Sequence, residues 1–306
     1  VNHLVKLEKL EAQNNCGIND AGVVQCINLK TLNASNNRKI TNVNHLANLE
    51  ILDAYYNCGI NDAGIVHCVN LKLLNAACNQ KIININHLAK LEILNAYGAC
   101  GINDAGIVHC VNLKSVNISA NPKITNVNHL TKLEILDADH NCGISDVGII
   151  QCINLKSLSV PYNQKITNVN HLVKLEILDA SNKCGIFGAS NICGINDAGL
   201  VHCVNLKSLN ASSNPKITNI NHLAKLEILD ASGECGINDG GIVQCINLKS
   251  LNASDNSEII NVNHLVKLEI LDASEYCGIN DDGIVHCINL KYLTHYGNPK
   301  ITKKID

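Results

Sequence analysis

Trp and Met are absent from this 306-residue sequence, Phe occurs once, and aromatic residues make up only 3% of it. No run of about 18 apolar residues is present, which excludes a membrane-spanning helix. Phosphate-binding loops, zinc-protease helices and dinucleotide fingerprints are also missing, so the sequence predicts no catalytic residue and no cofactor. The formal net charge is −3, and no basic surplus is available to neutralise a phosphate backbone. We therefore expect no nucleic-acid partner.

A repeated pattern accounts for nearly the whole chain. Repeats of 22 residues, here called odd, begin at 7, 49, 91, 133, 175, 226 and 268. Repeats of 20 residues, called even, begin at 29, 71, 113, 155, 206, 248 and 290, which gives fourteen repeats. A chain of stacked repeats forms one elongated solenoid whatever its length. The sequence thus predicts a single domain over residues 1–306, and because it begins within a repeat, we expect a cap or further domain before Val1.

Each repeat opens with a pattern close to Leu-x-x-Leu-x-Ala, as at Leu49–Ala54. Apolar residues at positions four and six alternate with outward-facing neighbours, which is the periodicity of a β-strand. Fourteen such strands in one register predict a long parallel sheet. Position nine of every even repeat is Asn, and a buried amide there would bond the backbone of adjacent turns.

The odd repeats return through a Gly-Ile-Asn-Asp-x-Gly-Ile pattern, as at Gly59–Ile65. We expect Asp62 and its equivalents to cap a short helix on the far side of the sheet. The return of the even repeats is too short for more than one helical turn.

The sixteen cysteines form two series rather than a disulfide framework. Equivalent cysteines recur on every second strand, about 10 Å apart, because neighbouring strands lie about 4.8 Å apart. A disulfide needs Cα atoms within about 7 Å, so we expect free, buried thiols and a reducing, cytoplasmic location. Position ten of the odd repeats carries Cys16, Cys58, Cys100, Cys142, Cys184, Cys235 and Cys277, and position twenty carries a second seven, which leaves Cys78 and Cys193 outside both series.

These repeats resemble those of leucine-rich-repeat proteins. The even repeats are similar to the bacterial internalin type through Asn121–Val127, and the odd repeats to the cysteine-containing type of F-box receptors through Gly101–Ile107. The resemblance implies an α/β solenoid, a right-handed horseshoe with the parallel sheet on its concave face and short helices or turns on its convex face. It also implies a non-catalytic scaffold that binds a partner protein on the concave face. The alternative is the substrate-recognition arm of a ubiquitin-ligase receptor whose adaptor domain lies outside this chain, which contains no F-box segment.

Two regular ladders have structural explanations. Position two alternates Glu and Lys from repeat to repeat, which would place opposite charges side by side on adjacent strands. One His recurs in the return of each even repeat, as at His45 and His87, and single histidines two strands apart cannot assemble a metal site. We expect these histidines to be packed surface residues. No metal site is predicted.

The repeats differ from one another mainly at positions seven to nine of the odd repeats and seven to eight of the even ones. All seven tyrosines fall on the expected strand face or its edge, and Tyr is a frequent anchor of binding surfaces. Nine extra residues near 185–193 carry the single Phe, and this loop either grips a partner or is a tolerated duplication. The predicted partner-binding residues are Tyr55, Tyr56, Tyr97, Asp139, His140, Tyr162, Phe187, Glu234, Asp255, Glu275, Tyr276 and Tyr296.

Overall fold

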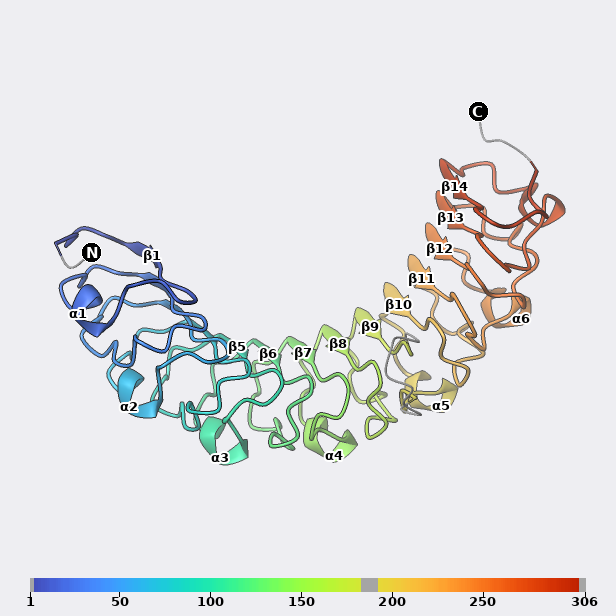
Figure 1. Cartoon of the computed structure of the whole chain (residues 1–306). Helices are drawn as coiled ribbons and strands as arrows, with labels where there is room; N and C mark the ends of the chain where they lie inside the picture. The colour runs from blue at the N-terminus through green and yellow to red at the C-terminus, as the bar shows by residue number, and fades with distance from the viewer. Residues whose placement is uncertain (1–2, 183–191, 303–306) are drawn as a thin grey trace. The chain divides into compact units, whose positions relative to one another are not determined.

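The computed structural model describes residues 3–182 and 192–302. The chain divides into two compact units, Val1–Asn154 and Leu155–Asp306, and each is described by itself. In each unit the strands lie along one side and the short helices along the opposite side (Figure 1). This arrangement confirms the predicted leucine-rich-repeat solenoid. The prediction of a single domain stays a prediction.

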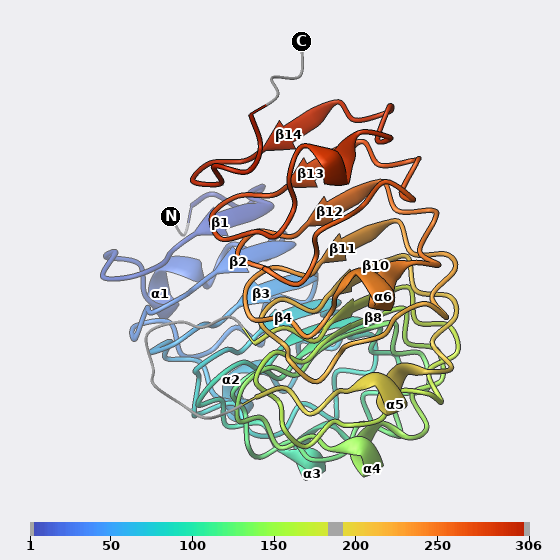
Figure 2. The same cartoon turned by 90° about the vertical axis from the view of Figure 1, so that its right-hand side faces the viewer.

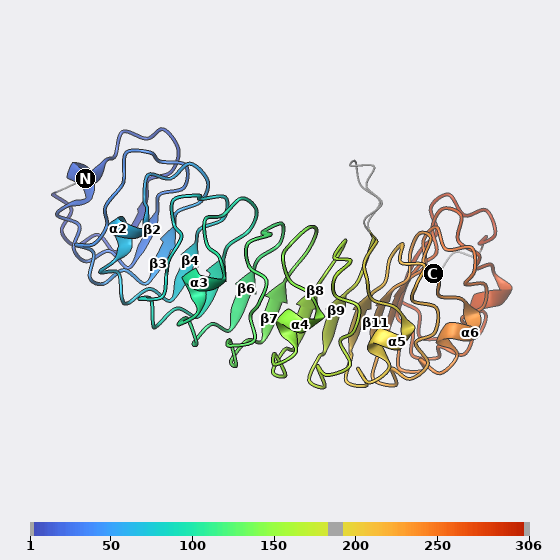
Figure 3. The same ribbon diagram turned by 90° about the horizontal axis from the view of Figure 1, so that it is seen from below.

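The first unit contains a parallel sheet of seven three-residue strands, each paired with the next in sequence. Four single-turn helices follow its odd-repeat strands, and Figure 3 shows α2, α3 and α4 in succession. The elements are β1 (Lys9–Glu11), α1 (Asp20–Val23), β2 (Thr31–Asn33), β3 (Ile51–Asp53), α2 (Asp62–Ile65), β4 (Leu73–Asn75), β5 (Ile93–Asn95), α3 (Asp104–Ile107), β6 (Ser115–Asn117), β7 (Ile135–Asp137) and α4 (Asp146–Ile149).

The second unit repeats this plan with seven further parallel strands, and Figure 2 shows β11 to β14 stacked in order. Its last odd repeat has a 3-10 helix in place of the α-helical turn. The elements are β8 (Ser157–Ser159), β9 (Ile177–Asp179), α5 (Asp197–Leu200), β10 (Ser208–Asn210), β11 (Ile228–Asp230), α6 (Asp239–Ile242), β12 (Ser250–Asn252), β13 (Ile270–Asp272), η1 (Asp282–Ile284) and β14 (Tyr292–Thr294).

The core is built from the positions that the strand periodicity places inward. Leu52 and Ala54 are fully buried, and Leu74 and Ala76 occupy the same two positions in the next repeat. The Asn of each even repeat is buried among them, as predicted. Asn79 donates from Nδ2 to the carbonyl oxygens of Ala54 and Ile60 at 2.9 and 3.2 Å, and its Oδ1 accepts from Lys81 N at 2.9 Å. One side chain thus satisfies three backbone groups of two adjacent repeats.

The capping prediction was wrong by one residue. Asn61, not Asp62, is the N-cap of α2, and its side chain accepts a hydrogen bond from Gly64 N. Asp62 lies in the first helical turn and accepts from the backbone of the following even repeat, at Ile83 N (2.7 Å) and Asn84 N (3.2 Å). The aspartate ladder therefore joins adjacent repeats rather than starting helices.

The assignment of the inserted repeat also needs correction. Cys193 is fully buried, and Gly194 N donates to Asn163 O just as Gly59 N donates to Asn37 O. Cys193 therefore occupies the core position that the sequence interpretation gave to Cys184. The extra residues precede Cys193, and both Cys184 and Phe187 lie outside the described residues.

The two structural ladders form as expected. Lys72 Nζ lies 2.9 Å from Glu50 Oε2, and the equivalent pair Lys249–Glu227 is separated by 2.8 Å. The return histidines are half-buried rather than simply superficial. The His87 ring Nε2 lies 3.1 Å from Ile65 O of the preceding odd repeat, which gives each ring a fixed structural role.

Candidate functional site: the strand face

The strand face is the surface formed by the side chains at positions three and five of the strands and at positions seven to nine of the turns that follow them. Position three of six odd repeats carries an exposed isoleucine, such as Ile51 at 39% and Ile228 at 51% exposure, whereas the first odd repeat has Lys9 there. These isoleucines lie on alternate strands from β3 to β13, and sequence reasoning missed this row. The strand pattern could have revealed this row, because Ile is usually buried and is therefore unusual at an outward-facing strand position.

Three predicted site residues come together on the first unit. The rings of Tyr55 and Tyr56 lie 5.7 Å apart between centroids, with an interplanar angle of 31°. Tyr56 N donates to Ala77 O, and Cys78 N donates to Tyr97 O, so adjacent turns connect all three tyrosines. The three side chains are 41–49% exposed. We call Tyr55, Tyr56 and Tyr97 the tyrosine patch.

Four other predicted residues, Asp139, His140, Tyr162 and Phe187, do not form a single described site. Asp139 and His140 belong to the first unit and Tyr162 to the second, while Phe187 lies outside the described residues. His140 is exposed, whereas Asp139 and Tyr162 are half-buried.

Three further predicted residues, Glu275, Tyr276 and Tyr296, lie on adjoining turns of the second unit. Glu275 N donates to Tyr296 O at 2.6 Å, and Tyr276 N donates to Asp255 Oδ1 at 3.4 Å. Tyr276 and Tyr296 are 83% and 79% exposed. Glu234 is also exposed but comes from an earlier odd repeat.

Position eight of most repeats has a left-handed backbone. Tyr56 has φ 61°, Tyr162 57° and Glu275 58°, whereas Gly98 and Gly233 occupy the same position elsewhere. A non-glycine residue loses roughly 1–2 kcal/mol in this conformation. The turn belongs to the fold, because Asn, Ala and Ser adopt it too. Its effect is to fix the backbone from which the variable side chains project.

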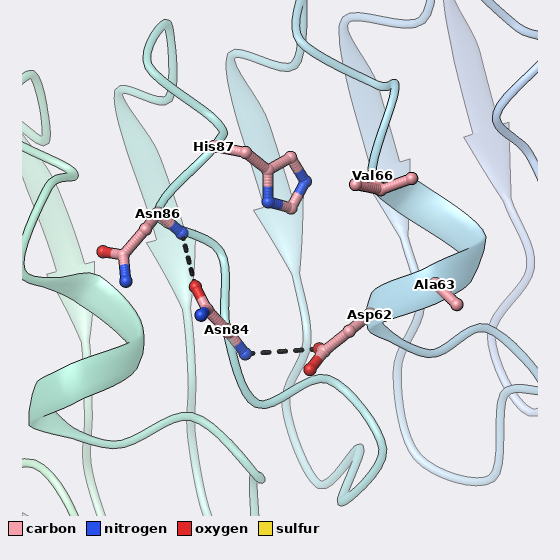
Figure 4. Close-up of a pocket in the computed structure, with 6 residues that line it drawn as sticks. All are labelled: Asp62, Ala63, Val66, Asn84, Asn86 and His87. Carbon is pink, nitrogen blue, oxygen red and sulfur yellow. Dashed lines mark hydrogen bonds between the residues drawn. The ribbon is translucent and has the colours of Figure 1, made fainter.

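The opposite side of the first unit has two shallow hollows, related by the 42-residue period of an odd and an even repeat. Figure 4 shows the first, lined by Asp62, Ala63, Val66, Asn84, Asn86 and His87. Asp62 accepts from Asn84 N, and Asn84 Oδ1 accepts from Asn86 N at 3.0 Å. The polar groups of the hollow are thus already engaged by the fold, and nothing in it resembles a nucleophile with its base.

The buried thiols are poor nucleophiles. Burial raises the pKa of Cys58, Cys68 and Cys100 to about 11, so they are protonated at neutral pH. Every cysteine in the described ranges is free, and only Cys16 and Cys78 there are half-buried. Cys78 lies beside the tyrosine patch. Its Sγ would be 2.8 Å from a Cβ atom added to Gly98, the residue that follows Tyr97.

Within the described ranges, no group of three or more His, Cys, Asp or Glu side chains could hold a metal ion. The same residues include no helix long and apolar enough to span a membrane.

By sequence, the chain matches no protein-family model and no curated protein. By structure, it is similar to an internalin from Listeria monocytogenes, with 22% identity over 88% of this chain and 87% of that chain and a TM-score of 0.58. It is also similar to a leucine-rich-repeat protein from Leptospira interrogans, with 18% identity over 97% of this chain and 83% of that chain and a TM-score of 0.56.

A third similar structure is TLR13 in complex with single-stranded RNA, with a TM-score of 0.64 and 18% identity. The likeness covers 98% of this chain but 51% of the TLR13 chain. At these identities the comparisons show the fold alone. The chain has the leucine-rich-repeat fold, a solenoid of stacked repeats.

Proposed function

We propose that this protein is a non-catalytic scaffold that binds a partner protein on its strand face, the concave face of the predicted horseshoe. The tyrosine patch is the observation that carries the proposal. Three large side chains stand partly exposed on two turns that are separated by the turn of one even repeat, next to the exposed Ile51 and Ile93. Aromatic anchors of this kind usually supply most of an interface's binding energy.

The position of the tyrosines also supports binding. Tyr56 occupies a left-handed turn in which Gly98 stands two repeats later. A bulky side chain there is unfavourable for folding, and it makes functional sense if the ring contacts a partner. The same reasoning applies to Glu275 beside Tyr276, at φ 58°.

The free thiols support a proposed reducing compartment. Fully buried cysteines such as Cys58 and Cys100 act as small apolar side chains, and each is free. Oxidising conditions would not be needed to hold this fold together.

The test compares two triple variants of equal size. Replacing Tyr55, Tyr56 and Tyr97 by Ser should weaken capture of the partner by at least about tenfold, since each aromatic anchor contributes about 2 kcal/mol or more. The control replaces the exposed return-side residues His67, His109 and His202 by Ser. Loss of capture by the histidine triple, with normal binding by the tyrosine triple, would refute the proposal.

Cys78 provides an independent probe of the same patch. In a chain with Cys16 and Cys184 replaced by Ser, a bulky maleimide should react mainly with Cys78, because the other described cysteines are buried. Labelling Cys78 should block the partner. Unchanged binding after complete labelling would contradict a role for the patch.

A further inference from the structure

The two units share an isoleucine row but differ in the charge that accompanies it. In the second unit one row of paired residues alternates isoleucine with serine, and its isoleucines are Ile177, Ile228 and Ile270. A second row, two residues further along the same strands, alternates aspartate with asparagine, and its aspartates are Asp179, Asp230 and Asp272. The first unit has as many carboxylates in the second row, at Glu11, Asp53 and Asp137 beside Asn95, but Glu11 is paired with Lys9 at 3.1 Å. The turns differ more: those of the first unit carry the tyrosine patch and one carboxylate, Asp139, whereas those of the second unit carry Glu234, Asp255 and Glu275.

The carboxylates of this face have no cationic partner in the part of the chain that the structure describes. Within the described ranges, none of Asp179, Asp230, Asp272, Glu234, Asp255 and Glu275 forms an ion pair. The lysines that could neutralise them are already engaged. Lys207 and Lys249 lie 2.8 Å from Glu176 and Glu227, and Lys216 Nζ donates to the carbonyl oxygen of Cys193 at 3.2 Å.

Three buried hydroxyl groups lie beneath this face. Ser181, Ser212 and Ser274 occupy position seven, beyond the ends of β9, β10 and β13. They are at most 8% exposed, and their Oγ atoms have no hydrogen-bond partner among the described residues. Because these atoms are buried, the contacts open to a ligand are the exposed isoleucines and carboxylates rather than these hydroxyls.

The spacing of the rows selects the conformation of the ligand. Equivalent side chains on every second strand are about 9.6 Å apart, since adjacent strands are separated by about 4.8 Å. Three residues of a polyproline II helix rise about 9.3 Å. Seven residues of an α-helix rise about 10.5 Å. Over the three isoleucines the accumulated mismatch is therefore about 0.6 Å for polyproline II and about 1.8 Å for an α-helix.

We propose that the strand face of the second unit binds an extended basic segment of a partner protein, in polyproline II form, that presents an apolar and a basic side chain in every three residues. The apolar side chains lie on Ile177, Ile228 and Ile270, and the basic ones face the aspartates beside them. Because this face is acidic, a complementary partner segment is basic, and the row spacing sets the repeat length of that segment. This inference rests on the proposed function and narrows it to a class of partner. Nucleic acids and anionic lipids carry the wrong charge for this face.

The experiment measures fluorescence anisotropy of a labelled peptide made of four copies of Leu-Arg-Pro, titrated with the full chain. One comparison peptide replaces Arg by Glu, and another inserts Gly after each Pro to lengthen the period. We expect both changes to weaken binding by at least about tenfold, and binding of the first peptide to fall with added salt. Equal binding of the Glu peptide or of the lengthened peptide would overturn the inference, as would no binding of the first.

The test variant replaces Asp179, Asp230 and Asp272 by Asn. The fold tolerates this change, because Asn210 and Asn252 at the same position of even repeats already accept the bond from the residue two places on, at 3.0 and 3.1 Å. The control variant E8Q/E50Q/E92Q removes the same number of negative charges from the first unit. The Asn variant should bind the Leu-Arg-Pro peptide at least about tenfold more weakly than the unchanged chain, whereas the affinity of the control variant should differ by less than about twofold.

The two proposals fail separately. If the peptide does not bind while the tyrosine triple still loses its partner, the inference about the second unit is wrong and the proposed function stands. If the tyrosine triple keeps its partner and the return-side histidine triple loses it, the proposed function is wrong whatever the peptide does.

Discussion

Replacing Asn79 by Leu tests whether the buried amide ladder holds adjacent repeats together. The substitution keeps a similar shape but removes two donated bonds, to the buried residues Ala54 and Ile60, and one accepted from Lys81 N. Each buried group left without a partner costs about 1–3 kcal/mol, so the loss for the three groups is about 3–9 kcal/mol. Burial of the new side chain returns about 1.5–3 kcal/mol. We expect a net destabilisation of about 1.5–6 kcal/mol.

Urea unfolding followed by circular dichroism measures this difference in the free energy of unfolding. Amide hydrogen exchange should show the loss of protection concentrated around Ala54–Ile60, because each repeat contacts mainly its neighbours. The matched control is Gln80→Leu at the adjacent exposed position, which should change stability by less than about 0.5 kcal/mol. If the Asn79 variant is as stable as the Gln80 variant, the ladder does not have the role assigned to it.

Three further predictions concern the turns and the thiols. Gly64→Ala should destabilise the chain by about 1–3 kcal/mol in thermal unfolding, because the added methyl group would overlap the Thr41 carbonyl oxygen. The control, Gly22→Ala, should be neutral or stabilising, because its methyl group would lie 3.3 Å from the nearest atom, Ile18 Cγ2. Tyr56→Gly should raise stability by up to about 1 kcal/mol while weakening partner binding. A fall in melting temperature would contradict the claim that the left-handed backbone of Tyr56 is unfavourable for folding. The buried thiols should contribute fully to stability against urea at neutral pH, and this contribution should be lost between pH 9.0 and about 11, because the unfolded chain loses thiol protons before the folded one does; all sixteen thiols should react in the denatured chain without reductant.

The fold could be predicted because the same strand pattern recurs in all fourteen repeats. The alternation at Leu52 and Ala54 showed which strand side chains face the core, and the Glu–Lys alternation predicted the ion pairs between neighbouring strands, which are observed at 2.8–2.9 Å. The buried Asn79 could also be inferred, since an invariant amide between apolar residues needs backbone partners.

The errors came from contacts between repeats, which local patterns do not specify. Asn61 and Asp62 are both good capping residues, and only the position of Ile83 and Asn84 shows that Asp62 serves the next repeat. Counting from the start of the repeat gave Cys184 the core position, whereas packing gives it to Cys193.

The candidate site was only partly predictable. The three residues of the tyrosine patch were found because they interrupt an otherwise constant repeat. The exposed isoleucines were missed for the opposite reason, since Ile228 and its equivalents are constant and appeared to be part of the core pattern. The unpartnered hydroxyl of Ser274 depends on the packing of its turn and has no signature in the sequence.

Site-specific photo-crosslinking tests the central claim most directly. A photoreactive benzoylphenylalanine replaces, one at a time, Tyr56, Tyr97 or Tyr276 on the strand face, and Val66, Val108 or Val243 on the return side, all of which are 42–83% exposed. The scaffold proposal predicts that one partner protein is crosslinked from the strand-face positions and not from the return side. Crosslinks to the same partner from the three valine positions alone would contradict it.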